Sequence, residues 1–163
     1  MSLARPRSLF AFAFLGCVAL MGGALYLEHI VGLEPCPLCV LQRIFVIAFA
    51  VVCLIGAIHG PGRIGTRVYS VFALLFAAGG AATAARQIWL QTVPADQLPA
   101  CLPSLEYMME ALPFQEIIRV VLHGSADCAE VNWTLFGMSI PEWSLLAFVG
   151  MIGFALLQLL RRD

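Results

Sequence analysis

Long stretches without charged residues alternate with short polar segments along this chain. A helix needs roughly 20 residues to cross the hydrocarbon core of a bilayer, which is about 30 Å thick. Each stretch approaches that length, although the second does so only when it begins at Pro37 and includes Gln42 and Arg43. The pattern predicts an all-α membrane protein, a bundle of four transmembrane helices that forms one domain over residues 1–163. The predicted spans cover residues 9–27, 37–58, 68–85 and 143–160.

The first stretch has a second interpretation, because Arg5 and Arg7 precede it as basic residues precede a cleaved signal peptide. Its apolar run is longer than the roughly 7–15 residues of a signal core. A retained membrane helix is therefore preferred, with processing as the alternative.

The arginines indicate the orientation of the spans, since cytoplasmic loops of membrane proteins are enriched in basic residues. Pairs of arginines lie before the first span, between the second and third, and after the fourth: Arg5, Arg7, Arg63, Arg67, Arg161 and Arg162. Segment 87–142 instead holds seven acidic residues and one arginine, Arg119. Both termini are therefore predicted to be cytoplasmic. The loops 28–36 and 87–142 are expected to face outward, which is the periplasm if the membrane is a bacterial inner membrane.

The long outer loop has a helical periodicity of its own. Two sets of apolar residues recur at i, i+3, i+4 and i+7 on either side of Pro113. The sets are Leu105, Met108, Met109 and Leu112, and then Phe114, Ile117, Ile118 and Val121. Because Pro113 disfavours helical geometry at the residue before it, two short amphipathic helices are predicted rather than one. Their apolar faces are expected on the membrane surface or the top of the bundle, or else packed on a small extramembrane core.

Composition supports the membrane assignment and removes one class of function. Hydrophobic residues make up 61% of the chain and charged residues 12%, against about 25% charged in ordinary soluble proteins. The mean hydropathy is +0.93. Nine arginines, no lysine and ten acidic residues give a net charge of −1. The chain therefore lacks the basic surface that a nucleic-acid partner requires.

The predicted topology divides the six cysteines into two classes. Cys17 and Cys53 fall inside the first and second spans, where a lone cysteine usually acts as a small apolar side chain. The other four lie on the outward side or at its membrane edge: Cys36, Cys39, Cys101 and Cys128. In an oxidising periplasm, disulfides between outward cysteines would persist.

Cys36-Pro37-Leu38-Cys39 is a Cys-X-X-Cys motif, which alone can be a redox couple, half of a zinc site or a chance pair. Val40 excludes a c-type haem site, which needs His after the second cysteine. A four-cysteine zinc site with Cys101 and Cys128 is formally possible. However, 26 residues separate those two cysteines, so the compact second pair of a zinc ribbon is missing. Oxidised disulfides suit the compartment better.

Proline residues place the motif at the start of a helix. Pro35 and Pro37 suit a first turn, whose amides have no intrahelical acceptor. A thiolate there is stabilised by the helix dipole and by any nearby cation. Arg43 follows Cys39 by four residues, so both can lie on one helix face. An arginine at membrane depth is interpreted as functional, the alternative being an anchor whose head group snorkels to the interface.

A thiol pair at the lipid boundary has an evident use. Electrons taken from thiols outside the membrane can pass to a carrier dissolved in the lipid. Cys101 and Cys128 would form the relay on the water side, with Cys36 and Cys39 on the lipid side, linked by thiolate attack and mixed-disulfide exchange.

The chain resembles the DsbB family of quinone-linked disulfide oxidases over nearly its whole length. The general features are four spans, both termini inside and two outward cysteine pairs. The motifs are specific when taken together: Glu34-Pro35-Cys36-Pro37-Leu38-Cys39 with Gln42-Arg43, Trp89-Leu90-Gln91, Cys101, Asp127-Cys128-Ala129-Glu130, and Phe136-Gly137 with Pro141-Glu142-Trp143.

The resemblance implies a route for the electrons. A Cys101–Cys128 disulfide would be attacked by a reduced soluble oxidase of the DsbA type, which has a thioredoxin fold, and Cys101 would carry the mixed disulfide. Cys128 would then exchange with Cys36, and Cys39 would contact the ring of a quinone, either ubiquinone or menaquinone.

The resemblance also implies a quinone site that includes Arg43, which matches the arginine that supports the quinone in the family. Some members carry His near the outer end of the third span, where this chain has Gln87. Gln87 can donate a hydrogen bond to a quinone carbonyl, but it cannot deliver a charge.

Two other classes of function compete with this enzyme. One is a non-enzymatic four-helix membrane protein whose outer cysteines form structural disulfides or bind zinc. The other is a reductase that passes electrons outward, which would need cysteines reachable from the cytoplasm. Cys17 and Cys53 are predicted to be too buried for that role.

Overall fold

The computed structural model describes residues 6–94, 113, 115–116, 124, 126–131 and 133–161. Four long helices dominate it: α1 (Pro6–His29), α2 (Pro37–His59), α3 (Arg63–Leu90) and α7 (Ile140–Leu160). All four are long and apolar enough to cross a membrane. The prediction of an all-α membrane protein with four transmembrane helices is confirmed.

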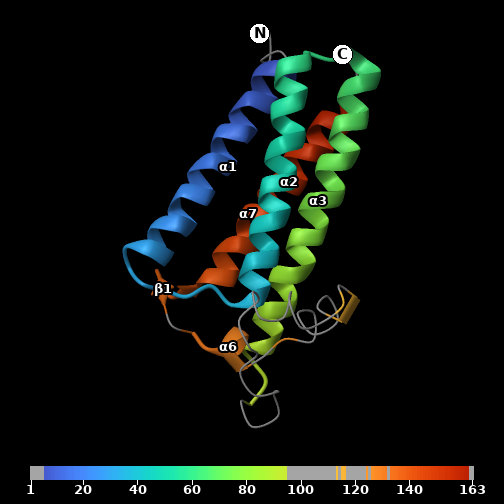
Figure 1. The fold of residues 1–163 in the computed structure, drawn as a ribbon. Helices are drawn as coiled ribbons and strands as arrows, with labels where there is room; N and C mark the ends of the chain where they lie inside the picture. Colours follow the sequence, from blue (N-terminus) through green and yellow to red (C-terminus); the bar gives the residue numbers. More distant parts are fainter. Residues whose placement is uncertain are drawn as a thin grey trace.

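Three smaller elements lie at the end of the bundle where α2 begins and α3 ends, which we call the cysteine end (Figure 1). They are α6 (Ala126–Ala129) and the strands β1 (Thr134–Leu135) and β2 (Met138–Ser139), which pair antiparallel. The two amphipathic helices predicted for residues 105–121 lie almost entirely outside the described residues.

The helices extend beyond the apolar stretches because backbone hydrogen bonding continues into the interface, where charged side chains reach water. α3 shows this most clearly, since it begins at Arg63 and continues to Leu90. Gln87, which the charge pattern assigned to the start of the outer loop, therefore lies in the last turn of this helix.

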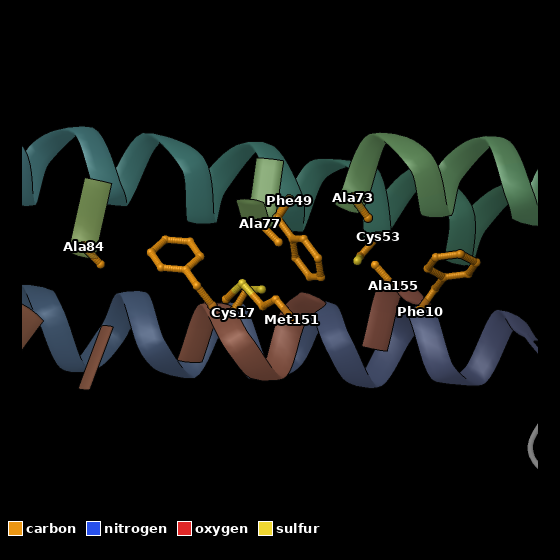
Figure 2. Packing of buried hydrophobic residues seen from close by; sticks show 10 residues of the cluster. Phe10, Cys17, Phe49, Cys53, Ala73, Ala77, Ala84, Met151 and Ala155 are labelled. Carbon is orange, nitrogen blue, oxygen red and sulfur yellow. The ribbon is translucent and has the colours of Figure 1, made fainter. Parts of the chain in front are cut away.

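The core of the bundle is built by small residues on α3 that face aromatic rings from its neighbours. Ala73, Ala77 and Ala84 are fully buried and line one face of α3 (Figure 2). Gly80 on the same helix lies directly against the ring of Phe148 from α7. Small residues let transmembrane helices approach closely, so their association gains dispersion contacts. As a result, α3 packs tightly along both α2 and α7.

Cys17 and Cys53 belong to this same core, at 3% and 0% exposure, and Figure 2 shows both sulfurs among apolar side chains. Large hydrophobic side chains cover the outside of the bundle, for example Phe12, Ile64 and Leu157, each at least 70% exposed. Such a surface is stable only in contact with lipid. The chain is a multi-pass membrane protein.

The first helix is attached differently from the others. α1 packs along α2 but makes few contacts with α7. Figure 1 shows that α1 leans away from α2 as it approaches the cysteine end. Residues of α1, α2 and α7 line a cavity that includes Cys39.

Candidate active site

Cys36 and Cys39 lie in the first turn of α2. Cys36 is the N-cap, with extended backbone, and Pro37 occupies the first helical position. The Cys36 sulfur accepts from the backbone N–H of Cys39 at 3.4 Å, as N-cap side chains do. It also donates to the Cys39 sulfur at 3.1 Å. Both residues are thiols, and formation of a disulfide would require the sulfurs to approach by only about 1 Å.

A third cysteine joins this pair from a distant part of the sequence. Cys128 lies in α6, is 1% exposed, and packs with Leu38 and Leu90 from α2 and α3. Its side chain hydrogen-bonds with that of Cys36. Cys36 therefore stands between two other sulfurs, as a disulfide relay requires. Cys101, the fourth predicted redox cysteine, lies outside the described residues.

The hydrogen bonds of Cys36 affect its ionisation. Its bonds with Cys128 and with Cys39, followed by burial, raise the pKa of the Cys36 thiol above its ordinary value. When all three residues are reduced, Cys36 is therefore held as a thiol.

Gln87 approaches the pair from the last turn of α3. Its Nε2 lies 3.3 Å from both the Cys36 and the Cys39 sulfur. Its Oε1 accepts a hydrogen bond from Gln42 Nε2 at 2.7 Å and lies 3.6 Å from the Cys39 sulfur. The sequence did not single out Gln42 as a site residue. The available signal was its position in an otherwise apolar run, three residues after Cys39 and so on the same helix face.

A cavity of about 530 Å³ lies between α1, α2, α7 and the hairpin that β1 and β2 form. Its lining is mostly apolar, with contributions from Leu20 and Ala24 of α1 and from Phe148 of α7. Cys39 and Arg43 both line it. A smaller cavity of about 60 Å³ lies next to the cysteine pair and is lined by Cys36, Cys39 and Gln87, among others. Cys39 therefore lines both cavities, whereas Gln87 lines only the smaller one.

The head group of Arg43 is held inside the bundle. It forms an ion pair with Glu28 of α1 and donates to the backbone carbonyl of Ala24 at 3.3 Å. The Arg43 and Glu28 side chains are 22% and 28% exposed, and Glu28 also lines the large cavity. The guanidinium is therefore attached to α1 at two points, the Glu28 carboxylate and the Ala24 carbonyl. A simple snorkelling anchor does not account for this attachment.

Comparison with known proteins decides the family of this chain. A family model described as "Disulfide bond formation protein DsbB" matches residues 6–158. The chain belongs to the DsbB family. It is similar to "Disulfide bond formation protein B 1" of Pseudomonas aeruginosa, with 72% identity over 162 residues that cover 99% of each chain. It is also 70% identical to a "Disulfide bond formation protein B" of Stutzerimonas stutzeri, over the whole of both chains. A Hahella chejuensis protein of the same name is 50% identical over 144 residues, 88% of this chain and 87% of that protein.

Membership in the DsbB family assigns a chemical class to the three adjacent sulfurs. Disulfide bond formation is thiol–disulfide oxidoreductase chemistry, so this DsbB-family chain is an enzyme of that class. Among the residues that the structure describes, no three His, Cys, Asp or Glu side chains are arranged to hold a metal ion. The family assignment, rather than that absence, favours the redox interpretation over a zinc site.

Glu28 is a second residue of this DsbB-family site that the sequence analysis missed. It lies in the last turn of α1, 15 positions before Arg43. An acidic residue at the end of an otherwise apolar span is a weak signal, because most such residues face water. Only the packing of α1 on α2 shows that this carboxylate meets a guanidinium.

Proposed function

We propose that this chain reoxidises a soluble periplasmic oxidase of the DsbA type and passes the electrons through two cysteine pairs to a membrane quinone. The observation that carries the proposal is the position of Cys39. Its sulfur contacts Cys36, which contacts Cys128, and its side chain also lines the apolar cavity beside Arg43. A sulfur placed in this way can receive electrons from thiols and give them to an acceptor from the lipid.

The exchange between the pairs is balanced in electrons and protons. A reduced partner dithiol attacks the Cys101–Cys128 disulfide, leaves as a disulfide, and deposits two electrons as two thiols. The Cys128 thiolate then attacks Cys36 of an oxidised Cys36–Cys39 pair, so that a Cys128–Cys36 bond forms, the Cys36–Cys39 bond breaks, and Cys39 leaves as a thiolate. Attack of Cys101 on Cys128 restores the first disulfide and leaves Cys36 and Cys39 as a dithiol.

The large cavity fits a quinone by its chemistry. A quinone ring is flat and apolar and carries two carbonyl oxygens, which need hydrogen-bond donors at the rim of an apolar site. The cavity of about 530 Å³ offers apolar walls, the Cys39 sulfur, and donors from Arg43 and Gln42. A bound quinone would supply a two-electron acceptor that takes up two protons to become a quinol.

Within this cavity Arg43 would stabilise negative charge. A fixed cation with few waters around it stabilises charge that develops during reaction, without the cost of reorganising solvent. Glu28 fixes the direction of the guanidinium, because the ion pair joins it to α1. The same positive charge favours the thiolate form of Cys39 over its thiol.

The decisive experiment follows both half-reactions together. The full-length protein in detergent is mixed with a reduced DsbA-type partner and ubiquinone, and partner disulfide and quinol are measured over time. We expect one quinol for each partner disulfide formed. Cys17→Ala, which removes a buried core sulfur away from the site, should retain this stoichiometry. Partner oxidation without quinol formation would overturn the quinone proposal, and absence of any partner oxidation would overturn the proposed function as a whole.

The proposed location is the bacterial inner membrane, with the cysteine end facing the periplasm. Single cysteines are introduced at Glu130, which is exposed beside α6, and at Gly62, which is exposed before α3, in a chain without the four outward cysteines. A membrane-impermeant maleimide added to intact cells should label Glu130→Cys. It should reach Gly62→Cys only after the membrane is permeabilised. The opposite pattern would reverse the orientation and place the redox pair in the cytoplasm.

A further inference from the structure

Two buried glutamines form a contact across α2 and α3 next to the redox pair. Gln42 is 5% exposed and Gln87 is 4% exposed. The Gln42 N–H donates to Gln87 Oε1 at 2.7 Å. Buried amides need partners at both ends, and this bond occupies the oxygen of Gln87. The NH₂ group of Gln87 is then directed at other acceptors.

The two sulfurs lie against this NH₂ group, and the Cys39 sulfur also lies 3.6 Å from Oε1. The Gln87 Nε2 is 3.3 Å from Cys36 Sγ and 3.3 Å from Cys39 Sγ. An amide N–H is only a donor, and a hydrogen bond to a charged acceptor is stronger than one to a neutral acceptor. The Gln87 amide therefore favours the state in which one of these sulfurs is negatively charged.

We propose that Gln87 is a catalytic residue that stabilises the thiolate of the Cys36–Cys39 pair, and that Gln42 is the positioning residue that fixes its amide. The inference rests on the proposed function, in which Cys128 attacks Cys36. In that step the Cys128–Cys36 bond forms, the Cys36–Cys39 bond breaks, and the electron pair of the broken bond stays on the Cys39 sulfur. The Gln87 N–H is already within reach of this sulfur, so the new charge meets a donor without rotation of a side chain.

This role differs from the quinone contact that the family resemblance suggested for Gln87. The side chain of Gln87 lines the small cavity next to the cysteine pair and not the large one that holds Arg43. Its Oε1 accepts from Gln42, and its Nε2 lies 3.3 Å from both sulfurs. Gln42 lines the large cavity and holds Gln87, which lines the small one.

The test is the thiol–disulfide equilibrium of the pair in the full-length protein, in detergent and without quinone or partner. The protein is equilibrated with mixtures of reduced and oxidised dithiothreitol at mildly alkaline pH. Thiols are trapped by alkylation, and peptide mapping gives the reduced fraction of Cys36 and Cys39. Gln87→Leu should lower the equilibrium constant for reduction by about tenfold, because the reduced state loses a donor to its thiolate. The rate at which iodoacetamide modifies Cys39 should fall as well, since only the thiolate reacts.

The role of Gln42 is separated by a double-mutant cycle. Gln42→Leu should shift the equilibrium in the same direction but less, because the freed Gln87 amide can turn its oxygen towards the sulfurs. Adding Gln42→Leu to Gln87→Leu should cause no further change, because Gln42 acts through Gln87. Gln158→Leu is the matched control, since Gln158 is also a buried glutamine (2% exposed) but lies in α7 near its last turn, away from the pair. It should leave the equilibrium constant unchanged.

Two results would overturn the inference. One is an equilibrium constant and an alkylation rate in Gln87→Leu that match the unmodified protein. The other is a full additive effect of the two substitutions, which would mean that Gln42 acts by a separate route. Because quinone and partner are absent, failure of the unmodified protein to reduce ubiquinone would overturn the proposed function alone and would leave this measurement standing.

Discussion

Replacing Cys128 by serine is expected to stop turnover and to leave Cys101 able to form a mixed disulfide only with the oxidised partner. The physical reason lies in the order of the sulfurs. Cys128 is 1% exposed and already hydrogen-bonded to Cys36, so it is placed to attack that residue. Serine has nearly the same size, but its hydroxyl cannot form a disulfide. The reduced partner then has no Cys101–Cys128 disulfide to attack. The Cys101 thiolate can still attack the disulfide of an oxidised partner: a bond from Cys101 to the partner forms, the partner's own disulfide breaks, and its second sulfur leaves as a thiolate.

The measurement is non-reducing electrophoresis followed by peptide mapping of the trapped species. With oxidised partner added, the adduct should be found on Cys101. With reduced partner and ubiquinone, quinone reduction should fall to the rate without enzyme. Cys53→Ala serves as the control, because it removes a fully buried sulfur from the core and should show neither effect. An adduct mapped to Cys36 would mean that the two pairs have exchanged roles.

Replacing Arg43 by methionine is expected to lower quinone turnover by at least about a hundredfold, the size of effect seen when a preorganised charge-stabilising donor is removed from an active site. Methionine keeps much of the apolar stem but removes the charge and its donors. Membrane insertion and disulfide pattern should remain unchanged. Arg43→Lys should recover part of the activity, because the charge returns without the planar donor fork.

Glu28→Gln distinguishes the charge of Arg43 from the attachment of α1. This variant breaks the ion pair but leaves the guanidinium beside the cavity. If the charge acts on the acceptor, Glu28→Gln should retain most of the turnover that Arg43→Met loses. Equal losses in both variants, measured as initial rates of quinol formation, would show that Arg43 acts only by holding α1 against α2.

Much of the bundle follows from residue pattern alone. Four apolar runs predict four helices because an unpaired backbone amide is costly in lipid, so only a helix can satisfy a single span. The prolines around Cys36 and Cys39 placed the motif at a helix start, and Cys36 is indeed the N-cap of α2. The sequence pattern did not predict the hairpin that turns at Phe136-Gly137. Both residues have positive φ (53° and 80°) in the structure, as a tight turn between two strands requires.

The contacts between helices could not be predicted in the same way. The pairing of Gln42 with Gln87 depends on the rotation of α2 and α3 about their own axes, which is set by the small residues of α3 and the rings that pack against them. The ion pair of Glu28 with Arg43 depends similarly on the height at which α1 crosses α2. A hydrophobicity pattern gives the faces of a helix but not this register, since many rotations bury similar apolar area.

The weak contact between α1 and α7 determines how an apolar ligand would be supplied to the large cavity. Both helices contribute to its wall, and they are not interlocked. A ligand dissolved in the bilayer would meet this seam from within the lipid and would never cross water. Its occupancy would then follow its mole fraction in the membrane rather than its concentration in the bulk. The apparent KM for an added quinone should therefore rise in proportion to the amount of detergent or lipid in the assay.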